Sequence, residues 1–444
     1  MRIEQFAFGR GKHARPIRIF VDGETVPDSP ELDVLLAFSH HPEVEIVGTD
    51  ERFSNTLRVD AYDAQNGYTP WAIQFEDGRD LRSGVLGPDI QEIGRRFAKP
   101  GQEERAERAT VMAHGAGDHG SDAFATSDSL LLEDLPRNVI ASGNPMTVSD
   151  AVGLLGLFLR VREDFALDIG EGIRYSFDRS SFYFVLMRDL TPSGWRWFSA
   201  CVVHSHHAQD DSLMLTAQSA MERLERSLRA RDRLHEKLQL PASRDLATEA
   251  IFYFDVALFM LGGAFDGLAH VAHTVHCLGG PKRAVGWGSS SWMKQLRTAN
   301  RHLEQLMTLG QPHRDARELI AILRNTIHEE ALRTVSWQTG ATRTERVVVP
   351  AGIEAKLETV LARIGTPADY GVLRQADGRL YIEPGMYLER ILPLVVAALN
   401  AVMDATPVDK LPGVDPSKLL TAPPDDQMFN ATIRRRIRLL SGIT

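Results

Sequence analysis

The sequence predicts an α/β N-terminal domain followed by a mostly α-helical C-terminal domain with a small β insertion. The length of 444 residues exceeds what one hydrophobic core usually serves, so we expect two or three domains. Short β-rich runs alternate with helix-like runs up to about residue 160, whereas apolar and amphipathic helical runs dominate later. The expected segments are an α/β domain at 1–160, a mixed connecting segment with a long charged helix at 161–244, a helical domain at 245–405, and a Pro/Asp-rich tail with a basic end at 406–444.

Strands and helices alternate in the first segment. The predicted strands are IRIFVDG, VEIVGTD, TPWAIQFED and SDAFATSD, and the predicted helices are PDIQEIGRRF, EERAERATVMA and VSDAVGLLGLFLRV. Thr147 or Ser149 is the expected N-cap of the last helix. HGAGDHG contains a formal GxGxxG pattern, but a dinucleotide site needs a strand before the glycines and a helix after them. Since the order here is the reverse, we expect a loop.

The connecting segment is less regular. YSFDRSSFYFVLMRDL fits a helix or a strand, WRWFSACVVH predicts a strand, and TAQSAMERLERSLRARDRLHEKL predicts a long amphipathic helix that ends before Pro241. The arginines of this helix are able to meet phosphates, but interleaved acids favour a solvated face with ion pairs. The arginines are Arg223, Arg226, Arg229, Arg231 and Arg233, and the acids are Glu222, Glu225 and Asp232.

The third segment is predicted to be mostly helical. Helices are expected at Ile251–Cys277, over WMKQLRTANRHLEQLM, at Arg314–Thr334 and over MYLERILPLVVAALNAVM. The β insertion comprises TERVVVP and a hairpin, VLRQADGRLYIEP, that turns at Asp377-Gly378. The tail ends in IRRRIRLL, which we expect to form a peripheral arm.

Composition narrows the class of protein. A net charge of −9 gives no overall attraction for nucleic acid, so any RNA or DNA contact needs a local basic patch. Only Cys201 and Cys277 are present, which argues against a disulfide framework and for a reducing compartment. The N-terminus lacks the apolar core of a secretory signal, and the longest apolar runs fall short of the roughly 20 residues that span a bilayer. The sequence therefore predicts a soluble, cytoplasmic protein.

Polar residues form a stripe along the predicted helix Ile251–Cys277. At about 100° per residue its members share one face, and they are Asp255, Gly262, Asp266, His270, His273 and Cys277. Buried carboxylates and imidazoles are costly unless they are paired or functional. Three interpretations stay open: a polar seam against a neighbouring helix or solvent, a polar active-site wall, and a metal site.

Arg324 and His328 lie four residues apart on the second helix of interest, and therefore on one face. A fixed guanidinium stabilises a phosphorane-like transition state, and histidine moves protons near neutral pH. That combination suits metal-free RNA cleavage, in which the 2′-OH is the nucleophile. The alternative is a charged surface on which Arg324 pairs with Glu329 or Glu330.

The run LRNTIHEE resembles the signature of the HEPN superfamily, in which an arginine and a polar residue precede a histidine. The resemblance covers roughly residues 245–405 and implies Arg324, Asn325 and His328 as the site. We add the hypothesis that Asp266 or His270 orients His328, the acid/base. Only three residues separate Arg324 from His328, fewer than the family's four to six. HEPN-like proteins commonly dimerise, and many are non-catalytic binding modules, so the resemblance also implies a homodimer.

The run GSDAFATSDSLLL resembles the end of a PIN-like domain, where clustered carboxylates bind Mg²⁺ or Mn²⁺ for phosphodiester hydrolysis. By position, this implies Asp122 and Asp128 as metal ligands, with Asp22 and Glu107 as the third and fourth. Oxygen-rich clusters suit such hard cations. VDGET replaces the usual Asp-x-Asn after the first strand. The alternative interpretation makes Asp122 and Asp128 capping residues of helices or turns.

A third pattern is the run ACVVHSHHAQDD, which resembles the zinc-binding start of JAMM metallopeptidases through His204 and His206. His207 stands where that family has proline, and Leu215 and Gln218 stand where it has serine and aspartate. A local metal site through His204, His206, His207 and Asp210 is therefore the alternative to a surface turn.

Both main resemblances point to RNA phosphodiester cleavage by different chemistries. The sequence therefore predicts a ribonuclease-type protein that binds RNA. The alternatives are a non-catalytic helical dimerisation or interaction protein, and a metal-binding or metallopeptidase-like protein that uses the histidine cluster.

Overall fold

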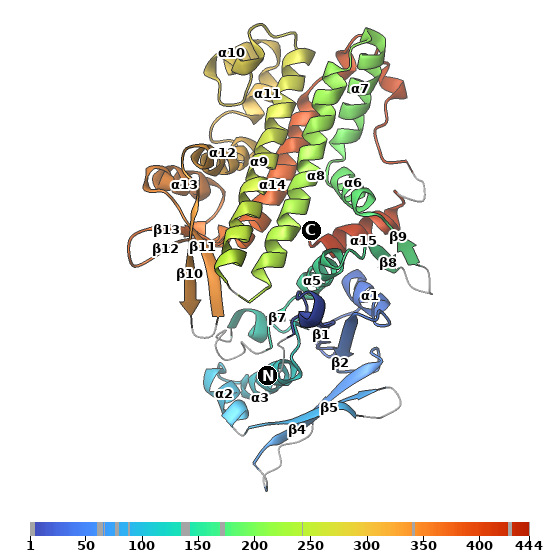
Figure 1. The fold of residues 1–444 in the computed structure, drawn as a ribbon, viewed down its shortest axis with the longest axis vertical. Coiled ribbons are helices and arrows are strands. Elements are labelled where there is room, and N and C mark those ends of the chain that lie inside the picture. Colours follow the sequence, from blue (N-terminus) through green and yellow to red (C-terminus); the bar gives the residue numbers. More distant parts are fainter. Residues whose placement is uncertain are drawn as a thin grey trace. The chain divides into compact units, whose positions relative to one another are not determined.

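The computed structural model describes residues 5–59, 65, 67–75, 80–87, 89–134, 143–168, 174–241, 243–339, 342–424 and 429–443. The chain forms two compact units. The N-terminal unit comprises Met1–Phe177 together with Arg435–Thr444, and the helical unit comprises Asp178–Arg434. The expected connecting segment 161–244 therefore does not form a part of its own, since most of it belongs to the helical unit. The fold is an α/β N-terminal unit and a mostly helical C-terminal unit with a small sheet (Figure 1).

The N-terminal unit is built on a seven-stranded sheet with the order β5-β4-β3-β2-β1-β6-β7. β1 pairs in parallel with β2 on one side and with β6 on the other, and β7 continues in parallel beyond β6. β3, β4 and β5 add an antiparallel edge. The strands are β1 (Ile17–Val21), β2 (Val44–Gly48), β3 (Asn55–Val59), β4 (Thr69–Phe75), β5 (Asp80–Leu86), β6 (Ala123–Ala125) and β7 (Pro145–Met146).

The central strands of this sheet consist mostly of apolar residues and are covered by helices. β1 and β6 are almost entirely buried, as expected for parallel strands covered on both faces. The core includes Phe20 and Phe124 of the sheet together with Ala109, Met112 and Ala116 of a helix. The helices of the unit are α1 (Pro30–Ala37), α2 (Asp89–Phe97), α3 (Glu103–His119) and α5 (Val148–Val161), and α5 contacts α1, β1 and β6. The side chain of Thr147 caps α5, one of the two predicted caps.

The glycine-rich run HGAGDHG is helical, so the expectation of a loop was wrong. Gly115 and Gly117 lie inside α3, and only Gly120 leaves the helix, in a left-handed conformation at its C-cap. Alanine and glycine make up much of the buried face of α3, where small side chains allow the helix to approach the sheet closely. Buried packing here outweighs the low helix propensity of glycine.

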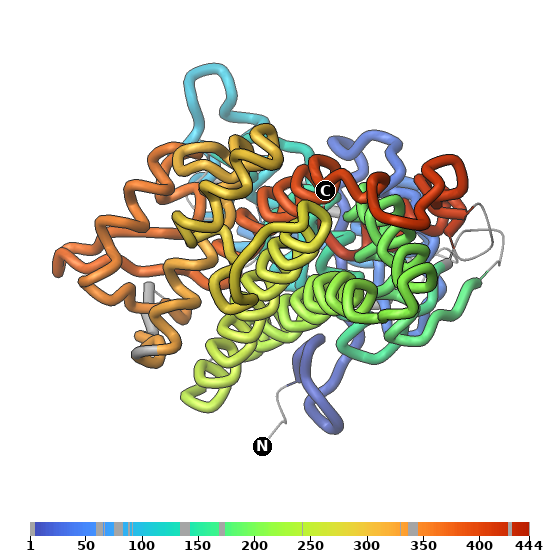
Figure 2. The backbone as a smooth tube through the Cα atoms, turned by 90° about the horizontal axis from the view of Figure 1, so that it is seen from above, coloured from blue at the N-terminus to red at the C-terminus, as the bar shows by residue number. Residues whose placement is uncertain are grey.

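The helical unit is organised around long helices. α8 (Ser212–Leu238) and α9 (Arg244–Val275) run side by side (Figure 2), and α9 also packs on α12 (Pro312–Glu329) and α14 (Pro384–Ala405). The other helices are α6 (Arg179–Leu190), α7 (Ser193–Ala208), α10 (Ser290–Ala299), α11 (Arg301–Leu306) and α13 (Ala351–Ile364). Phe254 and Phe265 of α9 and Tyr387 of α14 are fully buried, which places the core of the unit along α9.

A four-stranded sheet, β10-β11-β13-β12, forms the predicted β insertion. Its strands are β10 (Arg333–Thr339), β11 (Thr342–Val348), β12 (Val372–Arg374) and β13 (Leu380–Ile382). The predicted hairpin connects β12 and β13, and Gly378 takes the positive φ of 79° that its turn requires. A separate two-stranded sheet consists of β8 (Ala166–Asp168) and β9 (Arg174–Ser176).

Three predicted elements differ from the structure. WRWFSACVVH belongs to α7 and is not a strand, since Trp197, Cys201 and Ser205 recur at four-residue intervals on a buried helical face. The predicted single helix around Asn300 is divided into α10 and α11, because that asparagine side chain accepts the backbone N–H of Leu303 and caps α11. The predicted helix Arg314–Thr334 ends at Glu329.

The basic tail is not a peripheral arm. It forms α15 (Ala431–Ser441), and its residues from Arg435 onward belong to the N-terminal unit. There Arg160, buried in α5, donates to the backbone carbonyl of Leu440 at 2.6 Å. A Cβ on Gly156 would lie 1.8 Å from the same carbonyl oxygen, so the two backbones touch. The tail is thus a structural element of this unit.

Two helical stretches of the described chain, Arg244–Val275 and Pro384–Lys410, are long and apolar enough to cross a membrane. About half of each apolar stretch is buried inside the protein, 56% and 50% respectively. Core helices of a soluble protein have the same properties, and the pattern of burial is consistent with that role here.

Candidate functional site

The parallel strands of the N-terminal unit end together at one edge of the sheet. β1 has β2 on one side and β6 on the other, so the chain order reverses beside β1. In open α/β sheets, ligands bind outside the carboxyl ends of the strands at such a reversal. Asp22 follows β1 and Asp128 lies three residues after β6. Both predicted metal ligands therefore belong to this edge.

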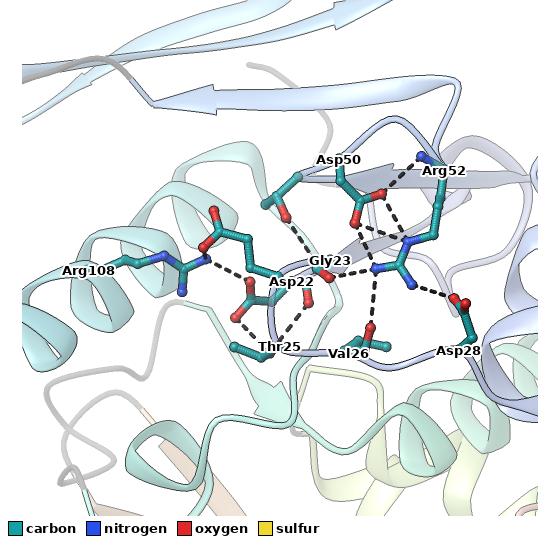
Figure 3. A network of polar contacts seen from close by, with 10 residues as sticks. Asp22, Gly23, Thr25, Val26, Asp28, Asp50, Arg52 and Arg108 are labelled. Atoms are coloured by element: carbon teal, nitrogen blue, oxygen red, sulfur yellow. Dashed lines mark hydrogen bonds and ion pairs between the residues drawn. The ribbon is translucent and has the colours of Figure 1, made fainter.

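Asp22 is completely buried, with 0% of its surface exposed. Its Oδ2 accepts hydrogen bonds from the hydroxyl groups of Thr25 at 2.9 Å and Thr126 at 3.3 Å. Its Oδ1 accepts from Nη2 of Arg108, on α3, at 3.0 Å (Figure 3). A buried carboxylate is tolerable only when it is hydrogen-bonded and neutralised, and this geometry supplies both.

Asp128 is also buried, with 2% of its surface exposed. Its Oδ1 accepts from Nη2 of Arg105 at 2.5 Å and from the backbone N–H of Leu130 at 3.0 Å. Its own backbone N–H donates to the hydroxyl oxygen of Thr126 at 3.0 Å. Since Thr126 also donates to Asp22, one hydroxyl group connects the two acidic residues.

Glu24 is a third acidic residue at this edge, and it was not predicted. Its Oε2 lies 2.9 Å from Nη2 of Arg108, so one guanidinium nitrogen lies between the carboxylates of Asp22 and Glu24. Burial works to lower the pKa of Arg108, but these two carboxylates outweigh it and raise the pKa above its usual value. The Asp-x-Glu spacing in VDGET is the sequence pattern that identifies Glu24. We call Asp22, Glu24 and Asp128 the acidic edge.

A second arginine fixes the loop beside the acidic edge. Arg52 donates to the carbonyl oxygens of Gly23 at 2.6 Å and Val26 at 3.2 Å, and it pairs with Asp28 and Asp50 (Figure 3). Hydrogen bonding from Arg52 holds the pKa of Asp50 below its usual value. A Cβ on Gly23 would lie 1.9 Å from Oδ2 of Asp50, so this backbone approach requires glycine.

Two predicted ligands do not join the acidic edge. Asp122 precedes β6 and so lies at the amino end of that strand, whereas Asp22 follows β1. Its carboxylate receives both terminal nitrogens of Arg15 at 2.7 Å and the backbone N–H of Arg18 at 2.9 Å. Glu107 faces α2, where it pairs with Arg95 at 2.8 Å. Both are structural ion-pair partners, and the predicted set of four carboxylates does not form.

The two guanidinium groups of α3 pair with the three carboxylates of the acidic edge and offset two of their three charges. Within the described ranges, no group of three or more His, Cys, Asp or Glu side chains is arranged to hold a metal ion as it stands. A cation at the acidic edge therefore requires Arg108 to move away from the oxygen atoms that it now contacts.

The helical unit brings together two of the other predicted site residues. Nη1 of Arg324, on α12, donates to Oδ2 of Asp266, on α9, at 3.0 Å. The side chain of Arg324 crosses Gly262, where a Cβ would lie 2.7 Å from its Cδ. Nε of Arg324 is shielded from solvent and has no hydrogen-bond partner. Glu330 pairs with Arg333 at 2.9 Å instead, and the side chain of Glu329 lies outside the described residues, so Arg324 is seen to face the predicted stripe.

Two of the remaining predicted residues of this helical site are more exposed to solvent than Arg324. His328 is exposed and its ring meets that of Phe259 edge to face, with centroids 4.9 Å apart. Asn325 is exposed as well. Burial lowers the pKa of His270, and Lys282 and Arg223 add to this, while the charge of Asp266 opposes it. The pair Arg324–Asp266 is thus formed, but His328 makes no described hydrogen bond to it.

Replacing Gly262 with alanine tests how closely Arg324 is held. The new methyl group would displace the arginine from Asp266, and overpacking of this kind costs about 1–3 kcal/mol. Urea unfolding of Gly262→Ala should show this loss, whereas Gly286→Ala, which adds a methyl group in open space, should change little. Equal stabilities of the two variants would contradict the observed packing.

Asp255 has an unusual environment on the same stripe of α9. Its Oδ1 is buried without a hydrogen-bond partner, and burial raises the pKa of this carboxyl to about 6. The folded pKa lies above the unfolded value of about 3.9. The protein therefore loses stability as pH rises from about 4 through about 6, because ionisation of this buried carboxyl disfavours the folded state. Relative to the wild type, Asp255→Asn should therefore gain stability between about pH 4 and about pH 7 in urea titrations. A pH-independent difference would refute this assignment.

The histidine cluster does not have the expected strand geometry. His204 and His206 both lie in α7, and two residues two positions apart on a helix point about 200° apart. Nδ1 of His204 lies 2.9 Å from the carbonyl oxygen of Pro412. Asp210 accepts from the backbone N–H and hydroxyl group of Ser212 instead. The run is a helix and its end, and the metallopeptidase resemblance loses its structural basis.

Comparisons of the chain with models of protein families, with curated proteins and with solved structures find no match.

Proposed function

We propose that the N-terminal unit hydrolyses RNA phosphodiester bonds with a divalent cation, Mg²⁺ or Mn²⁺, held at the acidic edge. The observation that carries the proposal is the pair of fully buried carboxylates, Asp22 and Asp128. They come from two adjacent parallel strands and are connected through Thr126. Burying a charged group costs free energy. A buried charged group at the carboxyl edge of a parallel sheet is therefore a candidate functional residue.

The donor atoms at the acidic edge fit a hard cation. Asp22, Glu24 and Asp128 offer only oxygen atoms, which Mg²⁺ and Mn²⁺ prefer. A positive nitrogen of Arg108 already lies 3.0 Å from Asp22 and 2.9 Å from Glu24, so this position favours positive charge. We assign Asp22 and Asp128 as the main ligands and Glu24 as the third.

The protein side chains and the cation would have different roles in hydrolysis. A bound divalent cation activates water and stabilises the charge that develops on the phosphate. Thr25 and Thr126 fix the orientation of the Asp22 carboxylate through their hydroxyl groups. Arg105 and Arg108 supply positive charge beside the ligands, in a chain whose net charge of −9 does not otherwise attract nucleic acid.

The choice of RNA rests on the resemblances of the two units, since PIN-like and HEPN-like proteins both include enzymes that cleave RNA. A second candidate activity is metal-free RNA cleavage in the helical unit. It is supported by Arg324, whose Nε has no hydrogen-bond partner and whose Nη1 is oriented by Asp266. His328 would be its acid/base and His270 a positioning residue.

Cleavage of end-labelled structured RNA distinguishes the two activities. With Mn²⁺ present, the wild type and His328→Ala should cleave the RNA, and EDTA or Asp128→Asn should abolish cleavage. Cleavage that persists in EDTA and is lost in His328→Ala would instead assign the activity to the helical unit. Absence of cleavage under every condition would contradict both activities and favour an interaction protein.

A further inference from the structure

Two arginines on α3 face the acidic edge. Arg105 and Arg108 are three residues apart, so they share a face of the helix. Each contacts one buried carboxylate, Asp128 and Asp22 respectively. The arginine side chains themselves remain 50% and 34% exposed. Their charged ends therefore contact the buried carboxylates, while the side chains as a whole still border solvent.

We propose that a divalent cation exchanges with Arg108 at the acidic edge, and that the arginines of α3 then bind the phosphate of the substrate. This inference rests on the proposed function and assigns its phosphate-binding residues. In metal-free protein the same arginines occupy the site by pairing with its carboxylates.

The cation and the guanidinium group of Arg108 would compete for the same position. A divalent cation bound by carboxylate oxygens lies about 2.0–2.6 Å from them. Nη2 of Arg108 now lies 3.0 Å from Asp22 and 2.9 Å from Glu24, in the position between these two carboxylates. A cation that uses both oxygen atoms cannot share that position with the guanidinium group, so Arg108 must swing away.

The net charge of the acidic edge explains why the exchange would favour binding of a phosphodiester. Three carboxylates and two guanidinium groups leave the metal-free edge with one net negative charge, which repels a phosphodiester. A divalent cation reverses this to one net positive charge, which the single negative charge of a phosphodiester balances. A released guanidinium group is also suited to phosphate, because its planar donors bind two phosphate oxygens at once.

The test compares Arg108→Gln with the wild type in two measurements on the full chain. Titration calorimetry with MnCl₂ alone should show tighter binding to Arg108→Gln, by about tenfold, because no guanidinium group competes. Steady-state cleavage with Mn²⁺ should show a KM for RNA raised by about tenfold, because a phosphate contact is lost. Arg95→Gln, which removes the ion pair of Glu107 on the other side of α3, should change neither quantity.

The outcomes separate this inference from the proposed function. Equal or weaker Mn²⁺ binding by Arg108→Gln, with Mn²⁺ binding to the wild type intact, overturns the exchange alone. An unchanged KM overturns the phosphate contact. No Mn²⁺ binding to the wild type overturns the metal-dependent function and the exchange with it. Thermal melting of each variant confirms that a loss of function is not a loss of fold.

Discussion

Replacing Asp128 or Asp22 with asparagine is expected to lower Mn²⁺-dependent RNA cleavage by about 10³-fold. A bound cation contributes several kcal/mol of transition-state stabilisation, and losing about 4 kcal/mol corresponds to this factor. Each substitution removes the negative charge of a proposed ligand but keeps the shape of the side chain. Initial rates at saturating Mn²⁺ measure the effect. The two variants should fall to similar rates if both residues hold the same ion, as we propose.

Asp122→Asn is the matched control for these two variants. Asp122 is also an ion-paired aspartate of the sheet, but it precedes β6, where Arg15 and the backbone of Arg18 hold it. Its substitution should affect stability and leave the cleavage rate of folded protein near that of the wild type. Full activity in Asp128→Asn, or an equal loss of activity in folded Asp122→Asn, would contradict the assignment of the acidic edge.

Glu389→Ala is expected to destabilise the helical unit by about 3 kcal/mol, the low end of the cost of breaking a buried ion pair, because Arg231 keeps its contact with Asp232 at 3.2 Å. Arg231 is buried and gives Nε and Nη2 to the two carboxylate oxygens of Glu389 at 2.5 and 2.7 Å. Nε2 of His235 lies 2.6 Å from Oε1 of the same carboxylate. Urea unfolding measures the loss, and Glu222→Ala is the control. Glu222 pairs with Arg226 on an exposed helix face and should cost at most about 0.5 kcal/mol.

The same carboxylate has a defined effect on pH dependence. Burial works to raise the pKa of Glu389, but the charges of Arg231 and His235 outweigh it and hold the pKa well below its usual value. With a folded pKa below the unfolded value of about 4.3, its contribution is complete above about pH 5 and is lost as pH falls further. The stability difference between wild type and Glu389→Ala should shrink in acid. A difference that grows below about pH 4 would contradict the ion pair.

The fold was predictable where the sequence pattern is local. The apolar runs of β1, β2 and β6 and the amphipathic runs of α3 and α5 follow the periods of strand and helix directly. Asp22 was placed correctly at the exit of β1 for the same reason. Asp122 failed because it enters its strand, and a residue before a parallel strand lies at the opposite edge from one after it.

The partners of the buried charges were not predictable, because they lie far away in the chain. Arg108 is separated from Asp22 by 86 positions, and Arg231 from Glu389 by 158. In the sequence Arg231 is one of several arginines interleaved with acids along its helix, so a solvated face was the natural expectation. Packing of α8 against α14 buries it instead. Only tertiary structure shows which charges of a helix are paired in the interior.

The most direct test of the central claim is X-ray diffraction from crystals grown with MnCl₂, recorded at the manganese absorption edge. We predict an anomalous peak within ligand distance, about 2.0–2.6 Å, of the carboxylate oxygens of Asp22 and Asp128, with Arg108 turned away from them. A map at saturating Mn²⁺ with no peak at the acidic edge, and with Arg108 still paired to Asp22, would contradict it.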